Sequence, residues 1–362
     1  MHQYYEVIGV SSAGLELEDV KREQGIRTIE LEMSREITPL KDLVSLIKMV
    51  LLLKKEKPLI VHTHTPKAGI IGMLAAWITR VPHRLHTVAG LPLMESTGLK
   101  RKILSFVERL TYKCATNVYP NSFGLKDFII ENNLTTADKL KVLGNGSSNG
   151  IDTNYFSKTQ DIVQSGNALR LQYKIDSSTF VFIFVGRIVK DKGINELLNS
   201  FDKLSKIEKR IKLLLIGSLE EYLDPISEES KNILHTNKNI IEAGYQNDVR
   251  PFLAIADCLV FPSYREGFPN VVMQAGSMGL PSIVSDINGC NEIIENGVNG
   301  LIIPPKDISV LYNAMYNILQ DNQKTTYMAE NARKMIVDRY DQMFIWQAIK
   351  SEYDLLLNNK GL

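Results

Sequence analysis

The chain has 362 residues, of which 44% are hydrophobic, and this is enough for two α/β domains and too much for one ordinary core. Lysine and arginine total 42 against 41 acidic residues, so the net charge of +1 gives no reason to expect nucleic acid as a partner. The chain has three cysteines, Cys114, Cys258 and Cys290, and they lack C-x-x-C spacing. This pattern predicts neither a disulfide framework nor a zinc site, and it fits a reducing cytosol.

The start of the chain shows no secretory signal, because residues 1–6 are polar and aromatic rather than basic and then apolar. The longest apolar run, within 43–53, contains Ser45 and Lys48. It is shorter than the roughly 20 apolar residues that cross a bilayer. We therefore expect a cytoplasmic protein without a transmembrane helix.

Short apolar segments alternate with helical periods in the first half of the chain. Strands are expected at residues 5–10, 28–31 and 59–62, and helices at 15–24 and 40–55. Strands separated by helices imply right-handed βαβ units and a parallel sheet. A doubly wound domain normally opens with a buried strand and a glycine-rich turn, whereas the segment at Tyr5 looks like a second strand. We therefore expect the first strand of this domain to be missing.

The alternation of apolar segments and helical periods begins again near Thr179. There the apolar run 180–185 predicts a strand buried on both faces of a parallel sheet. Further strands are expected at 212–216, 240–243, 258–261 and 282–284, and helices at 194–204, 249–255 and 271–278. The sequence thus predicts two Rossmann-like halves joined within the polar stretch 155–166. The predicted domains cover residues 1–160 and 161–340, and a C-terminal helix over 341–362 packs back on the N-terminal domain.

Two cations follow the strand at 180–185 in a short loop. Gly186 would let a ligand approach the backbone closely, Arg187 offers a planar donor fork for phosphate oxygens, and Lys192 adds a mobile charge. The pattern fits a phosphate site. Taken alone, such a pattern more commonly belongs to a solvated loop with ordinary surface cations.

A second polar loop follows the strand at 258–261 and holds Glu266, where a carboxylate could accept hydrogen bonds from sugar hydroxyls. A helix begins near Asn270, which suits an N-cap, and the backbone N–H groups of Phe268, Asn270 and Val271 are candidate donors to an anion. The alternative for Glu266 is an exposed loop acid. Both loops follow the carboxyl ends of parallel strands, where open α/β sheets bind ligands.

An ordered series of motifs then covers almost the whole chain: Asn149-Gly150-Ile151-Asp152, Gly186-Arg187-x-x-x-x-Lys192-Gly193, Gly244-Tyr245, Ala256-Asp257, Pro262-Ser263, Glu266-Gly267-Phe268, Gly279-x-Pro281 and Gly297-x-Asn299-Gly300. With these motifs the chain resembles the retaining glycosyltransferase family 4. The resemblance implies the GT-B fold, in which two Rossmann-like domains with parallel sheets face each other across a cleft. It also implies a nucleotide-sugar donor as substrate, which we expect to be a UDP-sugar, and no cofactor.

The resemblance carries over residue by residue. It implies that Arg187 and Lys192 neutralise the donor diphosphate, so that no metal is needed, and that Glu266 binds the donor sugar near the reaction centre. The second acid of the family's motif falls at Gln274, whose amide oxygen can do part of the work of holding ribose hydroxyls. The acceptor hydroxyl would attack from the face that the diphosphate leaves, with retention at the anomeric carbon.

Three residues are candidates for the acceptor side: His64, Lys67 and His86. The family often has an active-site histidine where this chain has Ala89, and His86 three positions earlier either substitutes for it or is a strand residue. His64, with Lys67 behind it, is the better acceptor-side candidate, whereas His62 is at least as well explained as a structural histidine.

Two basic amphipathic stretches, 40–57 and 98–113, fit either contact with an anionic membrane surface or, more commonly, core-packed helices with solvated faces. We expect a glycan or lipid-linked glycan acceptor, in capsular, exopolysaccharide or O-antigen assembly, with peripheral contact at the inner membrane face. Two alternatives stay open: a UDP-sugar 2-epimerase of the same architecture, and a non-catalytic nucleotide-sugar-binding subunit.

Overall fold

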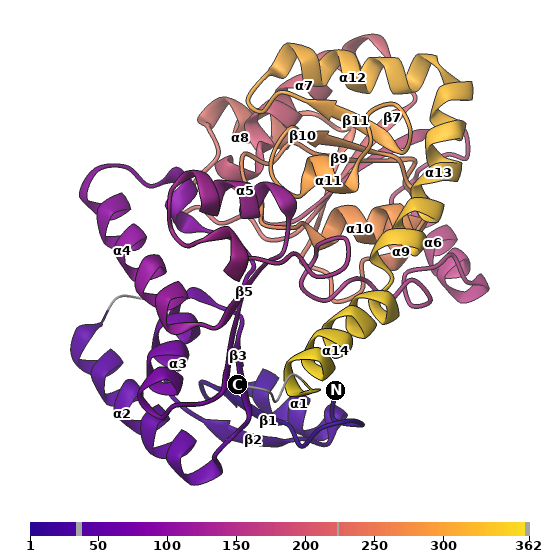
Figure 1. The fold of residues 1–362 in the computed structure, drawn as a ribbon. Coiled ribbons are helices and arrows are strands. Elements are labelled where there is room, and N and C mark those ends of the chain that lie inside the picture. The colour runs from indigo at the N-terminus through magenta and orange to yellow at the C-terminus, as the bar shows by residue number, and fades with distance from the viewer. Residues whose placement is uncertain (34–37, 223, 359–362) are drawn as a thin grey trace. The chain divides into compact units, whose positions relative to one another are not determined.

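The computed structural model describes residues 1–33, 38–222 and 224–358, and these divide into two compact units (Figure 1). The C-terminal unit is Asn149–Phe344, and the N-terminal unit is Met1–Ser148 together with the segment that begins at Ile345. The unit boundaries therefore differ from the predicted positions 160 and 340. Among the described residues, no helix is both long and apolar enough to cross a membrane.

The polar stretch predicted as a linker instead holds the start of a helix, α6 (Gln160–Gln172), within the C-terminal unit. Gly166 brings α6 close to α9 (Arg250–Ile255), because a Cβ at position 166 would stand 2.8 Å from the Ile255 side chain. The polar residues of α6 face water, and Ile162 is buried. The helix was missed because few of its residues are apolar.

The C-terminal unit is built on a parallel sheet in the order β11-β10-β9-β6-β7-β8. Its strands are β6 (Phe180–Val185), β7 (Ile211–Ile216), β8 (Ile240–Gly244), β9 (Cys258–Phe261), β10 (Ser282–Ser285) and β11 (Gly300–Ile303). The central strand β6 is buried over Val181–Phe184, as its apolar run predicted. Because the strand order reverses between β6 and β9, the carboxyl ends of these two neighbours form a topological switch point.

Helices surround this sheet and complete a continuous core. Besides α6 and α9 they are α7 (Ile194–Ile207), α8 (Glu228–Thr236), α10 (Asn270–Ser277), α11 (Cys290–Ile293), α12 (Ile308–Gln320) and α13 (Asn322–Tyr340). The helix start at Asn270 differs in one detail from the prediction. Pro269 occupies the N-cap position, Asn270 is the first helical residue, and no side chain caps α10.

The N-terminal unit contains two parallel sheets, β1-β2 and β3-β4-β5. The strands are β1 (Ile8–Ser11), β2 (Arg27–Glu30), β3 (Ile60–Thr63), β4 (His83–Val88) and β5 (Asn117–Pro120), and the helices are α1 (Leu15–Gln24), α2 (Pro39–Glu56), α3 (Pro66–Ile78), α4 (Gly98–Cys114) and α5 (Phe123–Glu131). Helix α3 packs against both α2 and α4. The predicted α/β class, with parallel sheets in two Rossmann-like units, is confirmed.

The last helix, α14 (Gln342–Asn358), belongs to the N-terminal unit from Ile345 onward. Its residues Ile349, Tyr353 and Leu356 pack around a small core formed by Leu85, Tyr119 and Leu143. The buried Glu352 accepts a hydrogen bond from the Tyr119 hydroxyl at 3.0 Å and is paired with Lys141. Residues 359–362 of the predicted C-terminal helix lie outside the described residues.

Candidate functional site

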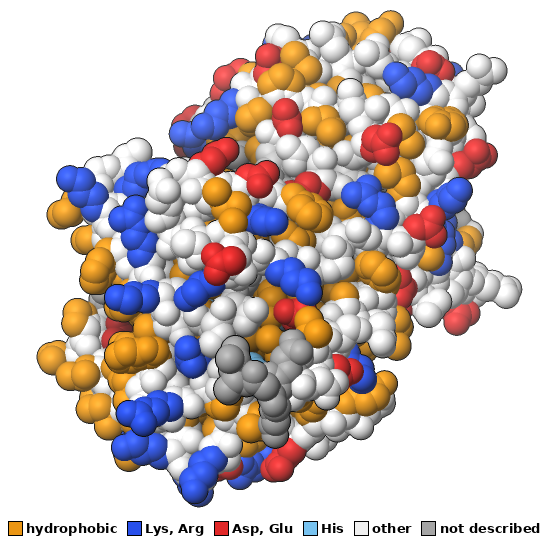
Figure 2. Space-filling view, in the orientation of Figure 1, with side chains coloured by type: hydrophobic (Ala, Val, Ile, Leu, Met, Phe, Trp, Pro, Cys, Tyr) orange, Lys and Arg blue, Asp and Glu red, His pale blue; other side chains and the backbone are white. Residues whose placement is uncertain are grey.

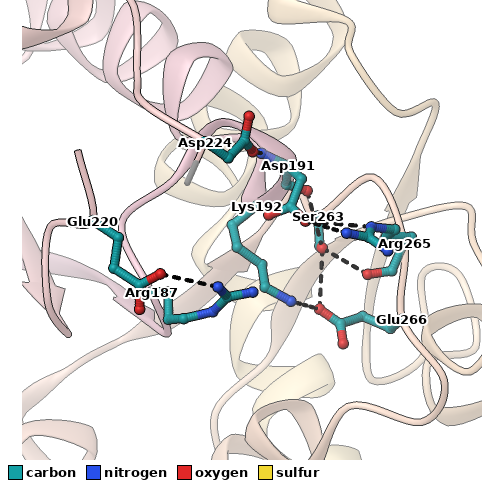
Figure 3. Close-up of polar contacts among 8 residues, drawn as sticks. All are labelled: Arg187, Asp191, Lys192, Glu220, Asp224, Ser263, Arg265 and Glu266. Carbon is teal, nitrogen blue, oxygen red and sulfur yellow. Dashed lines mark hydrogen bonds and ion pairs between the residues drawn. The ribbon is translucent and has the colours of Figure 1, made fainter. Parts of the chain in front are cut away.

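The two loops predicted to bind a ligand meet at the switch point of the C-terminal sheet (Figure 3). Gly186 directly follows β6, and the Glu266 loop begins directly after β9. A short 3₁₀ turn over Lys190–Lys192 leads from the first loop into α7. Since β6 and β9 are hydrogen-bonded neighbours, side chains far apart in the sequence converge at one edge of the sheet.

A row of glycines forms the backbone beside this site. Gly186, Gly217 and Gly244 follow or end the adjacent strands β6, β7 and β8, with φ values of 152°, 144° and 67°. The Gly217 N–H donates to the Gly244 carbonyl at 2.9 Å. A Cβ at position 217 would stand 1.9 Å from the Gly186 carbonyl oxygen, so only glycine fits there. The row presents backbone without side chains along the strand ends.

Each of the two predicted phosphate-binding cations is paired with a carboxylate in this structure (Figure 3). Arg187 Nη1 lies 3.0 Å from Glu220 Oε2, and the two side chains are 50% and 30% exposed. Lys192 Nζ is paired with Glu266 Oε1, and both of these side chains are 17% exposed. The second pair is therefore the better shielded from water.

The loops that carry Lys192 and Glu266 are joined by backbone contacts. Gly193, with φ +71°, lies directly against the Pro262 backbone. The Tyr264 N–H donates to the Asp191 carbonyl at 2.8 Å, and the Arg265 guanidinium pairs with the Asp191 carboxylate at 2.9 Å. These contacts hold the two loops in a fixed register.

Glu266 is further positioned by neighbours on its own loop and the next one. The Ser263 hydroxyl lies 3.0 Å from Glu266 Oε1, the same oxygen that meets Lys192. Figure 3 shows the second carboxylate oxygen turned away from both groups. The Asn288 side chain donates to the Gly267 carbonyl at 2.7 Å and supports the loop from behind. Glu266 is thus a half-buried, oriented carboxylate rather than a free loop acid.

Several of these neighbours were not singled out by the sequence. Glu220 is 33 positions from Arg187, and no local pattern links them. Cys290 is fully buried, and burial, together with the nearby Glu266 carboxylate, raises the pKa of its thiol well above the usual range. Ser263, the second residue after β9, belongs to the Pro262-Ser263 motif, but the motif did not predict its contact with Glu266.

The amino end of α10 follows the Glu266 loop. Phe268 is 9% exposed and its ring packs edge-on against Tyr340 with centroids 5.3 Å apart, so its side chain is structural. Asn270 and Val271 lie in the first turn of the helix, where backbone N–H groups have no carbonyl partner within the helix. Gln274 is half-buried one turn further on.

The acceptor-side candidates lie in the N-terminal unit, and the structure separates their environments. His86 is 2% exposed on β4, 2.8 Å from Thr63 Oγ1, and its ring packs directly on Gly69. Burial lowers its pKa to about 4. These contacts favour the second of the two alternatives for His86, that of a strand residue.

The other candidates differ from His86. Lys67 is paired with Asp42 at 2.6 Å. His62 is hydrogen-bonded to Tyr353 at 2.5 Å and Thr87 at 2.7 Å, and burial holds its pKa well below its usual range. His64 is exposed, with its ring centroid 4.3 Å from that of His62. Among the described residues, no three His, Cys, Asp or Glu side chains gather as a metal site.

Two family models match the chain. Residues 167–335 match the model described as glycosyl transferases group 1, and residues 1–122 match the model described as glycosyl transferase 4-like. The first match contains both loops of the switch-point site.

Similar proteins agree with these matches. The chain is 38% identical to the capsular polysaccharide biosynthesis glycosyltransferase CapM of Staphylococcus aureus, over 96% of this chain and 89% of that protein. It is 31% identical to the UDP-Gal:alpha-D-GlcNAc-diphosphoundecaprenol alpha-1,3-galactosyltransferase of Escherichia coli, over 90% and 83%. The crystal structure of Anabaena Alr3699/HepE in complex with UDP has a similar fold, with a TM-score of 0.80 at 20% identity over 96% and 91% of the two chains.

Proposed function

This chain belongs to the group 1 glycosyl transferases, and on that premise we propose that it transfers a sugar from a UDP-sugar to a hydroxyl acceptor with retention of anomeric configuration. The observation that carries the proposal is the pairing of Lys192 with Glu266 at the switch point beside Arg187. The pair sets a cation for a diphosphate next to an oriented carboxylate for a sugar. The choice of uridine draws on the Escherichia coli relative, whose name specifies UDP-Gal.

The donor diphosphate is assigned to Arg187 and Lys192. A diphosphate that enters here replaces Glu220 as the partner of Arg187 and competes with Glu266 for Lys192. Gly186 admits the phosphates to the backbone, and the N–H groups of Phe268, Asn270 and Val271 are further donors at the amino end of α10. Gln274 is assigned to the ribose hydroxyls.

The catalytic roles follow from charge. As the bond between the anomeric carbon and the diphosphate breaks, negative charge grows on the leaving phosphate, and Arg187 and Lys192 stabilise it from fixed positions. Two side-chain cations supply the positive charge that a metal ion would otherwise bring. Glu266 accepts hydrogen bonds from the donor sugar. The acceptor hydroxyl attacks on the side that the diphosphate leaves and gives its proton to a phosphate oxygen.

We assign the acceptor side to His64 in the N-terminal unit, because His86 is buried and Lys67 is paired with Asp42. The acceptor is a glycan or lipid-linked glycan in polysaccharide assembly. Both curated relatives support this class, one through capsular polysaccharide biosynthesis and the other through a diphosphoundecaprenol acceptor. We place the reaction in the cytoplasm.

A donor screen tests the proposal. Purified protein is incubated with a panel of UDP-sugars and a lipid-diphosphate GlcNAc acceptor, with and without EDTA, and released UDP and the anomeric configuration of the product are measured. We expect UDP release that depends on the acceptor, and a product in which the transferred sugar keeps the anomeric configuration that it has in the donor. EDTA should not lower the rate. An inverted product, or a rate abolished by EDTA and restored by a divalent metal, would contradict the mechanism. Conversion of the sugar without an acceptor would instead indicate an epimerase.

A further inference from the structure

Helix α2 turns an apolar stripe towards water. Five of its apolar side chains are between 52% and 82% exposed: Leu40, Leu43, Val44, Ile47 and Leu51. At about 100° of rotation per residue, these positions share one side of the helix. The opposite side is buried, as Met49 and Leu53 show with exposures of 6% and 7%. The stripe is therefore additional to the face that α2 packs on α3.

The charges of α2 are sorted in the same way. Its exposed cations border the stripe: Lys41, Lys48, Lys54 and Lys55. The acidic residues lie outside it and are paired, Asp42 with Lys67 and Glu56 with Arg27. The water-facing side of α2 thus combines apolar side chains with positive charge and contains no carboxylate.

Helix α4 repeats the pattern. Leu99, Ile103 and Phe106 are 74%, 45% and 67% exposed, three to four positions apart. Its exposed cations are Lys100, Lys102, Arg109 and Lys113. Glu108, the acidic residue of this helix, is 5% exposed, and burial raises its pKa. Both helices pack on α3, one on each side. Figure 2 shows hydrophobic and basic side chains gathered over the region that α2 and α4 occupy in Figure 1.

We infer that these water-facing sides of α2 and α4, here called the basic apolar surface, bind an anionic phospholipid bilayer. Apolar side chains on such a surface enter the boundary between headgroups and acyl chains, while lysine and arginine reach the phosphates beside them. Each cation near an anionic membrane adds to the attraction. A second copy of this chain is a poor occupant, because pairing two such surfaces would bring like charges together.

This inference deepens the proposed function and rests on it in one respect: a lipid-linked acceptor explains why the enzyme would need a membrane. The binding itself involves neither loop of the switch-point site. Vesicle binding and UDP binding can therefore be measured separately, and either can fail without the other.

The test is co-sedimentation of the full chain with vesicles of phosphatidylglycerol and phosphatidylcholine, compared with phosphatidylcholine alone. We expect binding to the anionic vesicles, weakened by salt. The double variant Ile47→Glu/Leu51→Glu should weaken it by about tenfold or more, because it places two carboxylates on the stripe. Leu171→Glu is the matched control, since Leu171 on α6 is 82% exposed in the C-terminal unit, and it should bind as the parent does.

UDP affinity, measured on the same samples, should be equal in all three proteins and shows that each is folded. Equal vesicle binding by the double variant and the parent, or no binding by the parent to anionic vesicles, would overturn the inference. Self-association of the parent that the double variant abolishes, without vesicle binding, would identify a second copy as the occupant instead.

Discussion

Gly193 approaches the backbone of Pro262 so closely that a Cβ at position 193 would stand 2.0 Å from the Pro262 carbonyl oxygen. Residue 193 immediately follows Lys192, and Pro262 begins the loop that carries Glu266. The spacing between the proposed diphosphate-binding cation and the proposed sugar-binding carboxylate therefore depends on a contact between two main chains.

Gly193→Ala should separate these loops. We expect a loss of about 2 kcal/mol or more in unfolding free energy, from the contact and the positive φ together, and a larger loss of turnover than of UDP binding. Gly297→Ala is the control, because Gly297 has φ +79° with nothing within 4 Å of its Cβ position. It should show only the backbone cost of about 1–2 kcal/mol. Urea unfolding of both variants measures the difference, and equal losses would show that the contact with Pro262 is unimportant.

Arg187→Ala and Lys192→Ala should each lower kcat by about 10²-fold or more, as loss of a fixed charge stabiliser does in other enzymes. Lys190→Ala is the matched control, since Lys190 is an exposed cation of the same loop. Its rate should stay near that of the parent. Steady-state UDP release measures all three, and an unchanged rate in the Arg187 or Lys192 variant would rule out its assignment to the diphosphate.

Glu220→Gln should tighten UDP binding. The neutral side chain no longer competes with the diphosphate for Arg187, and exposed ion pairs of this kind contribute about 0.2–1 kcal/mol. The expected gain is about 1.4- to 5-fold in affinity at low salt, and less at high salt. Glu221→Gln, a change of equal charge at the adjacent residue, is the control. Calorimetric titration with UDP compares the affinities of the two variants. Weaker binding by Glu220→Gln would mean that the Glu220 carboxylate contacts the ligand instead of competing with it.

Stability should fall between pH 7 and pH 5 because of His86. Burial lowers its folded-state pKa from 6.5 to about 4, so the unfolded chain takes up a proton first. The contribution of the neutral, buried His86 to the free energy of unfolding is fully present above the pKa of the unfolded state. It is lost as the pH falls towards the pKa of the folded state, and about 2 kcal/mol of it is lost at pH 5. His62 acts in the same direction.

Urea unfolding at a series of pH values tests this. His86→Gln should flatten the pH dependence whatever its absolute stability, whereas the exposed His235→Gln should not. A slope that is the same in both variants would mean that His86 is not the group responsible.

Sequence patterns predicted the elements whose signal is local. The run at 180–185 and the helix at 15–24 have the predicted bounds, because Gly186 follows the uninterrupted apolar run and Gly25, in the left-handed conformation, ends the helix. Helix α6 was missed because few of its residues are apolar and because its close approach to α9 depends on a glycine, Gly166.

In the candidate site, too, residues with a local sequence signal could be predicted and residues placed by tertiary contacts could not. Arg187, Lys192 and Glu266 could be identified because they lie in the loops that follow two apolar strands and match the spacing of the motifs. Glu220 could not, since it reaches Arg187 through the pairing of Ile188 with Leu219 across the loops that follow β6 and β7. The burial of His86 against Gly69 likewise depends on how α3 packs on β4.

The docking of α14 also has a consequence for synthesis on the ribosome. The C-terminal unit is one unbroken stretch, Asn149–Phe344, and its core can close as soon as that stretch has emerged. The small core around Tyr119 and Leu143 instead waits for Tyr353 and Leu356, which are translated later. The two larger cores of the N-terminal unit lie before residue 149 and can form first, so we expect this unit to begin folding early and to be completed only after the C-terminal unit has been translated.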